Sequence, residues 1–206
     1  MRPPSHARRA FTLVELLAVL GIMLLMAGVV VPAMSSLSRA NELSNASRLV
    51  SNMLTIARTE AVTKRMKMRF AVVRNWQDQP DANFRKMSIW KQESDQADWV
   101  QITKWEQVPQ GVVFDTNPTL DSPAALSGNL LSDTEANAFS ATVNGKNVDL
   151  QYAEFYPNGS ASMPAMTGFD IWLVLSATTP STDEASSNWA KITTSALTGR
   201  VKVERP

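Results

Sequence analysis

The sequence predicts an α+β protein in which a long N-terminal α-helix packs on an antiparallel β-sheet. Three observations support this prediction. Apolar residues follow helical spacing as far as about residue 63, and from Met66 onward they alternate with polar residues in short runs. Turn-forming segments separate these runs. The 206 residues suffice for one globular domain plus a long additional element.

The first element is a short basic segment followed by an apolar run. Residues 1–10, MRPPSHARRA, are interpreted as a leader peptide, and 23 uncharged positions follow from Leu16 to Ser38. About 20 apolar residues suffice to cross a bilayer as a helix. Because arginines precede the run, the N-terminus is expected in the cytoplasm. Residues 11–34 are therefore expected to form a transmembrane helix. A secretory signal peptide, a plain signal anchor and a buried core helix are the alternatives.

A single carboxylate, Glu15, lies at the edge of this run. At the centre of a membrane helix it would cost up to ~2.5–3.5 kcal/mol, and a charge kept there usually has a partner. If the chain is cut after Ala10, Phe11 carries a new α-amino group, and Glu15 lies four residues along the same helix. Glu15 could then meet the Phe11 amine of its own or a neighbouring subunit. Alternatively, the carboxylate simply reaches the membrane interface.

These residues carry a family resemblance. Residues 8–17, Arg-Arg-Ala-Phe-Thr-Leu-Val-Glu-Leu-Leu, resemble the cleavage and methylation motif of type IV prepilins. The resemblance implies cleavage between Ala10 and Phe11 by a prepilin peptidase and N-methylation of Phe11. It also implies that the transmembrane helix at residues 11–34 can serve as a filament-core helix and that Glu15 aligns subunits during assembly. The family favours glycine before the cut, and this chain has Ala10 there.

The second half of the long helix, residues 35–64, is amphipathic. Its apolar residues recur at i, i+4, i+7, i+8, i+11 and i+15, which is one face of a helix: Ala46, Val50, Met53, Leu54, Ala57 and Ala61. Polar residues lie elsewhere around it: Asn45, Arg48, Asn52 and Arg58. We expect one helix from about Phe11 to Thr63, with the second half packed on the sheet.

Residues 65–206 are expected to form the antiparallel β domain. The run from Met66 to Val72 has a period of two, typical of a half-buried strand. Further strands are predicted at Lys86–Lys91, Trp99–Val108, Val148–Tyr156, Phe169–Ser176 and Arg200–Glu204. Short turns between successive strands favour antiparallel pairing in one sheet.

Two polar segments interrupt this pattern. Residues 115–147 are rich in Asn, Ser, Thr, Asp and Ala, and predict a long surface loop with a short helix near Ser132–Phe139. A loop of this length is uncommon in a small domain. It could be a contact surface for a partner or a tolerated insertion. Residues Thr178–Ser187 predict a second polar loop at a hairpin tip.

Two short motifs extend the resemblance towards the C-terminus. Phe155-Tyr-Pro-Asn-Gly159 supplies a turn after a strand, because Pro157 fixes φ and Gly159 permits positive φ. Together with the closing Thr198-Gly-Arg-Val-Lys-Val203, it resembles the C-terminal domain of H-type minor pseudopilins and FimT-like minor pilins.

The composition disfavours catalysis. The chain has no cysteine, which excludes disulfides, zinc–thiolate sites and cysteine nucleophiles, and its only histidine is His6. The processed chain would therefore lack the usual general base and the commonest metal ligand. No phosphate-binding glycine loop or nucleophile elbow is present. We expect no catalytic residue, no metal site and no cofactor.

Basic residues cluster in two places, at Arg65, Lys67 and Arg69 and at Arg200 and Lys202. They could contact nucleic-acid phosphates, which supply most non-specific affinity. We favour the alternative that they form the solvated face of two strands. Without Arg2, Arg8 and Arg9, the 20 basic residues fall to 17 against 19 acidic ones, a formal net charge of −2.

The resemblance thus implies a minor pseudopilin or minor pilin, a structural subunit of a type II secretion or type IV pilus-like filament. Its partners would be other pilin or pseudopilin subunits, the prepilin peptidase and the inner membrane, which it would cross once. A filament-tip module that binds DNA or a secreted substrate is the second hypothesis. A membrane-anchored enzyme is the third.

Overall fold

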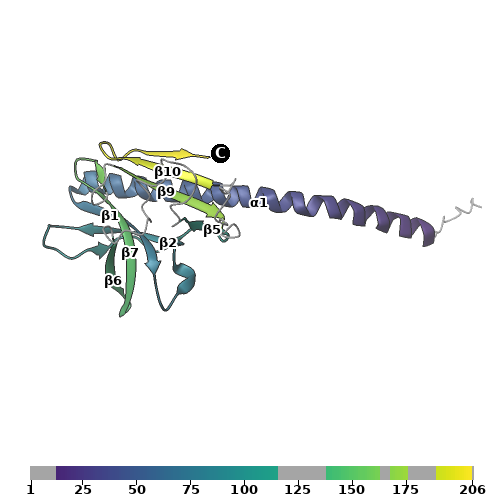
Figure 1. Ribbon diagram of the computed structural model, residues 1–206, viewed down its shortest axis with the longest axis horizontal. Helices are drawn as coiled ribbons and strands as arrows, with labels where there is room; N and C mark the ends of the chain where they lie inside the picture. The colour runs from purple at the N-terminus through teal and green to yellow at the C-terminus, as the bar shows by residue number, and fades with distance from the viewer. Residues whose placement is uncertain (1–12, 116–137, 163–167, 176–188, 206) are drawn as a thin grey trace, which may run out of the picture. The chain divides into compact units, whose positions relative to one another are not determined.

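The computed structural model describes residues 13–115, 138–162, 168–175 and 189–205, with the side chains of residues 27–40 excepted. The chain divides into two compact units, Met1–Arg39 and Ala40–Pro206. The predicted long helix is observed as α1, Leu13–Lys64 (Figure 1). Its expected beginning at Phe11 lies outside the described residues. Within the described part of the chain, no helix combines the length and the hydropathy needed to span a membrane.

In the second unit, α1 buries the face that the sequence predicts. The six apolar residues assigned to that face are all at most 5% exposed: Ala46, Val50, Met53, Leu54, Ala57 and Ala61. Asn45, Arg48 and Asn52 are exposed on the opposite side. Each large apolar side chain removed from water contributes about 1.5–3 kcal/mol, so this face fixes the helix on the β domain.

Eleven strands among the described residues form two antiparallel sheets, and the prediction of one sheet is wrong. The larger sheet contains β1 (Lys67–Asn75), β2 (Lys86–Gln92), β3 (Val100–Gln101), β4 (Glu106–Gln107), β6 (Ala138–Val143), β7 (Lys146–Phe155) and β8 (Ala161–Ser162). Its order is β3-β2-β1-β7-β6, with β4 paired to β2 and β8 paired to β7. The smaller sheet has the order β11-β10-β9-β5 and contains β5 (Val112–Phe114), β9 (Gly168–Leu175), β10 (Trp189–Ser195) and β11 (Val201–Glu204).

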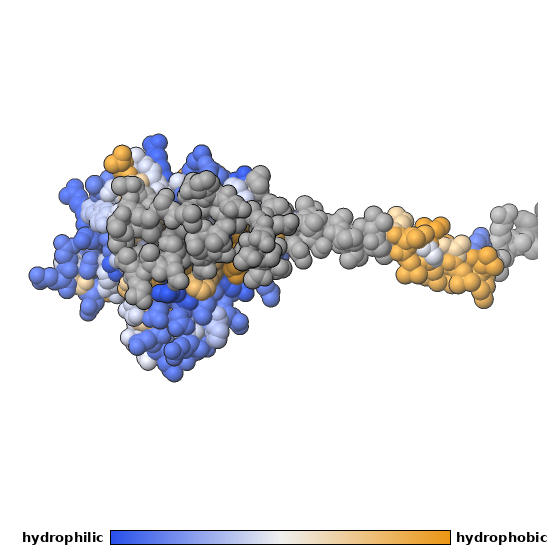
Figure 2. Space-filling view, in the orientation of Figure 1, coloured by the Kyte–Doolittle hydropathy of each residue, from blue (hydrophilic) through white to orange (hydrophobic). Residues whose placement is uncertain are grey.

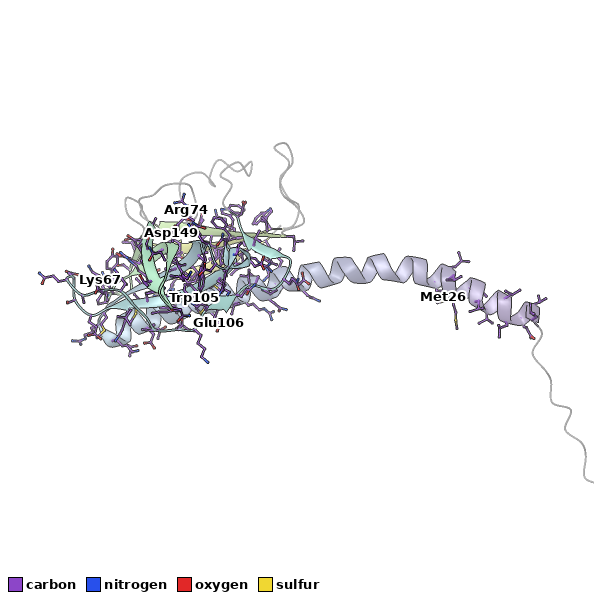
Figure 3. The ribbon with its side chains drawn as sticks, turned by 90° about the horizontal axis from the view of Figure 1, so that it is seen from below. Met26, Lys67, Arg74, Trp105, Glu106 and Asp149 are labelled. Carbon is purple, nitrogen blue, oxygen red and sulfur yellow. The ribbon has the colours of Figure 1, made fainter. Side chains whose placement is uncertain are left out.

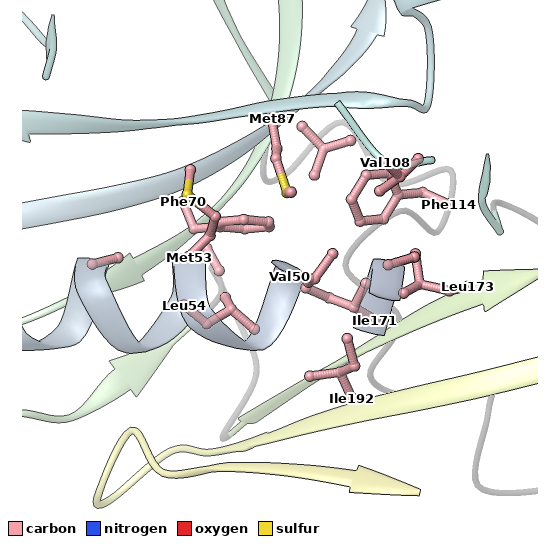
Figure 4. Packing of buried hydrophobic residues seen from close by; sticks show 14 of the residues in the cluster. Val50, Met53, Leu54, Phe70, Met87, Val108, Phe114, Ile171, Leu173 and Ile192 are labelled. Carbon is pink, nitrogen blue, oxygen red and sulfur yellow. The ribbon is translucent and has the colours of Figure 1, made fainter. Parts of the chain in front are cut away.

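The second half of α1 lies between these two sheets (Figures 1 and 4). Phe70 and Met87 of the larger sheet and Ile192 of the smaller sheet join the same buried cluster as Val50 and Leu54 of α1. The apolar face of α1 is wide enough to be covered from two sides. This is the physical reason for two sheets, and alternation along single strands does not reveal it.

The prediction of a loop at residues 115–147 is wrong for the last ten of these residues. Residues 138–147 form β6, a two-residue turn at Asn144-Gly145 and the start of β7. Asn144 and Gly145 have φ of 52° and 77°, as a type I′ hairpin turn requires. The predicted helix near Ser132–Phe139 is contradicted at Ala138 and Phe139, which lie in β6, and its other residues lie outside the described ones. The predicted hairpin tip at Thr178–Ser187 also lies outside them.

The predicted strand Trp99–Val108 is also interrupted. β3 and β4 pair with opposite ends of β2. Between them, the hydroxyl of Thr103 accepts a hydrogen bond from the Ile89 backbone N–H at 2.8 Å. A side-chain oxygen therefore replaces a backbone carbonyl, and the strand breaks there.

Both faces of the larger sheet are buried near β1, although the sequence predicts a half-buried strand. Ala71 and Val73 are fully buried on the face turned away from α1. Aromatic side chains cover them there, since Trp76, Trp90 and Tyr152 belong to the same cluster and Trp99, Trp105 and Phe139 pack against it.

Candidate functional site

The strongest candidate site is the exposed apolar part of α1 in the first unit. Every described side chain from Leu13 to Met26 is exposed, and Figure 2 shows this segment as an almost continuous hydrophobic surface. Its large apolar residues are 47–76% exposed: Leu13, Val14, Leu16, Leu17, Val19, Leu20, Ile22, Met23, Leu24, Leu25 and Met26. An exposed apolar surface of this extent marks a place where a protein meets another molecule.

Glu15 is the one polar side chain in this segment, and it lies in the first turn of α1. The N-terminus of a helix carries a partial positive charge, which favours a carboxylate at this position. The apolar side chains all around the helix would each gain about 1.5–3 kcal/mol on burial against a partner or lipid. The segment can therefore associate, with Glu15 as its only specific polar contact. The predicted cleavage site, Ala10 and Phe11, lies outside the described residues.

The candidate nucleic-acid residues belong to different elements. Lys67 and Arg69 lie in β1 of the larger sheet, Lys202 lies in β11 of the smaller sheet, and Arg65 and Arg200 are exposed beside those strands. Lys67 pairs with Asp95 at 2.6 Å, and Lys202 pairs with Glu204 at 2.6 Å. These carboxylates compete with phosphate for the lysines.

Arg69 is largely buried in an aromatic cluster. Its guanidinium lies 3.8 Å from the ring centre of Trp99 and 3.6 Å from that of Tyr152. Its Nε and Nη2 groups donate to Glu154 Oε1 at 2.9 and 2.7 Å. The side chains of Arg69 and Glu154 are only 13% and 15% exposed. This arginine joins β1 to β7 and to the segment that carries Trp99, so its role in the structure is to hold the outer face of the sheet together.

The carboxylate of Glu154 also accepts a hydrogen bond from a tyrosine. Glu154 Oε2 accepts from the Tyr156 hydroxyl at 2.9 Å, and that hydroxyl is 3.1 Å from Ser162 Oγ. Burial and the hydrogen bond to Glu154 raise the pKa of Tyr156 above its ordinary value of 10.0. Burial likewise raises the pKa of Tyr152.

Tyr156→Phe is expected to reduce the loss of stability at alkaline pH. Since the folded pKa is above the unfolded one, the folded state keeps a proton that the unfolded state releases, so this stability is complete below pH 10 and falls as the pH rises through the folded pKa. Urea midpoints measured from about pH 8 to about pH 11 should fall less steeply in the variant. Tyr152, Lys67 and Lys202, whose pKa values are also raised, contribute to the remaining slope. An identical slope in the two proteins would contradict this assignment.

Arg58 connects α1 to two glycine turns, and the sequence does not predict this contact. Its Nε donates to the Thr198 carbonyl at 2.6 Å and to the Gly159 carbonyl at 3.3 Å. Gly159 and Gly199 both have positive φ, 82° and 58°. The two motifs that carried the C-terminal resemblance therefore meet at one arginine. No periodicity in the sequence distinguishes Arg58 from other polar residues of the helix.

No group of three or more His, Cys, Asp or Glu side chains that could hold a metal ion occurs within the described ranges.

Comparisons with solved structures find chains of similar fold. The minor pseudopilin EpsH from the type 2 secretion system of Vibrio cholerae is 11% identical, with 80% of this chain and 98% of that chain covered and a TM-score of 0.44. A second structure of that protein gives 13% identity, coverage of 81% and 96%, and a TM-score of 0.46. The type IV minor pilin FimU of Pseudomonas aeruginosa gives 14% identity, coverage of 80% and 89%, and a TM-score of 0.45. No protein-family profile and no curated protein sequence matches the chain. The similar structures are of the kinds that the sequence resemblance named.

Proposed function

We propose that this chain is a minor pseudopilin or minor pilin, a structural subunit of a type II secretion or type IV pilus-like filament. The observation that carries this proposal is the helical segment Leu13–Met26, whose side chains are all exposed and all apolar except Glu15. A surface of this kind is unstable in water and requires lipid or other helices around it.

In this proposal the prepilin peptidase cuts between Ala10 and Phe11, and Phe11 is then N-methylated. Residues 11–34 anchor the subunit in the inner membrane, with the N-terminus in the cytoplasm. Residues 35–64 and 65–206 form the extracytoplasmic part. Support for the anchor comes from the 23 uncharged positions between Leu16 and Ser38.

Glu15 selects the packing of subunits in this proposal. An unpaired carboxylate among apolar helices is strongly disfavoured, whereas a carboxylate that meets an amine with good geometry is tolerated. The α-amino group of Phe11 on a neighbouring subunit would be that amine. Only subunits in one axial register could then form this pair. Glu15 would therefore determine how neighbouring subunits are aligned, and the apolar side chains would supply the affinity between them.

Glu15→Ala is expected to remain in the membrane and to lose incorporation into filaments by about tenfold or more, which corresponds to about 1.4 kcal/mol. The measurement is the fraction of an epitope-tagged full-length chain in the sheared filament fraction of its native host. Glu204→Ala, which removes a carboxylate outside the helix whose side chain is 40% exposed, is the matched control and should incorporate normally.

Intact mass and N-terminal sequencing of the membrane-extracted protein test processing separately. The expected chain begins with N-methylated Phe11. Normal incorporation of Glu15→Ala would refute the pairing role of Glu15, and a chain that still begins at Met1 in the native host would refute the filament function.

A further inference from the structure

A β-bulge in β1 gathers polar side chains at one end of the larger sheet. The register of β1 against β7 shifts between Val73 and Asn75, so Arg74 is an additional residue on the β1 side of the ladder. Bulges redirect side chains and are common next to binding sites. Here the bulge places Asn75 opposite Asp149 of β7.

The Asn144-Gly145 turn sets the register of the neighbouring hairpin. Because it is a two-residue turn, Ser140 of β6 lies opposite Asp149 of β7. Asn75, Asp149 and Ser140 therefore form one row across three strands, on one face of the sheet. Ser140 Oγ donates to Asp149 Oδ1 at 2.8 Å, and Asn75 Nδ2 lies 3.5 Å from Asp149 Oδ2.

Two adjoining hollows share Asn75 and Asp149 of this row, and Ser140 lines only the first of them. The first, of about 550 Å³, is lined by Arg74, Asn75, Ala138, Phe139, Ser140 and Asp149. The second, of about 310 Å³, is lined by Asn75, Gln77, Asp78, Gly145, Lys146, Asn147 and Asp149. Figure 3 places Arg74 and Asp149 close together on one side of the domain. The first volume is within the usual range for a small-ligand site.

The lining offers donors and acceptors in nearly equal measure and little apolar surface. Its two carboxylates, Asp78 and Asp149, disfavour an anionic ligand, and its two cations, Arg74 and Lys146, disfavour a cationic one. Lys146 and Asp78 already pair at 3.1 Å. An apolar ligand would leave these polar groups without water or partners.

We propose that the two hollows form a binding site for a neutral carbohydrate. Carboxylate, amide and guanidinium groups each present two hydrogen-bonding atoms in one plane, which matches the spacing of adjacent hydroxyls on a sugar ring. Asp149 accepts from ring hydroxyls, and the amides of Asn75 and Asn147 both donate and accept. The volumes of the two hollows, about 550 and 310 Å³, together leave room for two or more sugar units. The site contains no residue of α1, so it stands independently of the proposed filament function.

The test is saturation-transfer difference NMR on the full-length chain in an amine-oxide detergent, because detergents with sugar headgroups would compete. The probes are maltose, cellobiose and N,N′-diacetylchitobiose, with a sulfated heparin disaccharide as the anionic comparison. At least one neutral disaccharide should receive saturation. Asn75→Ala should bind it about tenfold more weakly, and Asn52→Ala, which removes an exposed amide outside the site, should bind it unchanged.

Ser140→Ala provides a second variant that leaves the bulge intact, and near-UV circular dichroism checks that each variant is folded. It should also bind the disaccharide more weakly. Absence of transfer to all three neutral disaccharides would overturn the proposal. Stronger binding of the sulfated disaccharide, or equal binding by folded Asn75→Ala, would overturn it as well.

Discussion

Gly199→Ala is expected to lower the free energy of unfolding by about 2–4 kcal/mol, because strain at positive φ adds to an overpacked contact. Gly199 has a φ of 58°. A methyl group there would lie 2.5 Å from the Gly159 carbonyl oxygen and 2.9 Å from Cδ of Arg58. The oxygen belongs to the backbone of another turn, so it cannot move away alone. Chemical unfolding of the full-length chain, followed by near-UV circular dichroism, measures the effect.

Gly145→Ala is the matched control for this prediction. Gly145 also has a positive φ, 77°, but a methyl group built on it would meet nothing within 4 Å. Gly145→Ala should lower the free energy of unfolding only through backbone strain, by about 1–2 kcal/mol. The difference between the free energies of unfolding lost in the two variants measures the effect of the close contact between the glycine turns. Equal losses would show that Gly199 is needed only for its backbone conformation.

This contact gives a physical reason for the two C-terminal motifs that extend the sequence resemblance. The turn at residues 155–159 and the turn before β11 approach so closely that the second tolerates no side chain. Arg58 of α1 then donates to a carbonyl of each turn. The helix, the larger sheet and the smaller sheet are joined at this point. The two C-terminal motifs, each of which is too short to identify a family alone, are therefore parts of one contact.

The buried face of α1 could be predicted because helical spacing alone determines it. Residues from Ala46 to Ala61 recur with the helical period, and each assigned one is buried. The division into two sheets could not be predicted, because alternation shows which face of a strand is apolar and not which strand lies beside it. Ile192 of β10 and Phe70 of β1 have similar local patterns but pack on opposite sides of α1.

The candidate sites also differ in whether the sequence predicts them. The exposed helix and Glu15 are visible in the sequence, because hydropathy and one isolated charge define them. The two polar hollows depend on the bulge at Arg74 and on the register of β6 against β7. The pairing of β1 with β7 joins residues more than 60 positions apart. Asn144-Gly145 is a strong hairpin signal, but the polar residues around it led to the prediction of a loop.

Arg69 illustrates how charge patterns mislead. It alternates with apolar residues in β1 as a solvated or phosphate-binding residue would. Its carboxylate partner, Glu154, is 85 positions away along the chain. Its aromatic partner Tyr152 lies in the same strand as Glu154, and Trp99 comes from a third segment. Only the pairing of β1 with β7 brings Arg69 opposite Glu154.

Glu154→Ala is accordingly expected to lower the free energy of unfolding by about 2–4 kcal/mol, because it leaves a largely buried guanidinium without its carboxylate. The side chains of Arg69 and Glu154 are 13% and 15% exposed, so water can replace the carboxylate only in part. The stacked rings of Trp99 and Tyr152 still favour the cation, which keeps the loss below that of an isolated buried charge. Tyr156 also loses the acceptor of its hydroxyl.

A double-mutant cycle with Arg69→Ala separates the interaction energy of the Arg69–Glu154 ion pair from the other contacts of the two side chains. If the ion pair acts as a unit, the double variant should be more stable than the sum of the single losses predicts, by at least about 1 kcal/mol. Glu204→Ala, which breaks the exposed pair with Lys202, should leave the urea midpoint unchanged. Additive losses for Arg69 and Glu154 would mean that the aromatic stack, and not the carboxylate, holds the arginine in the cluster.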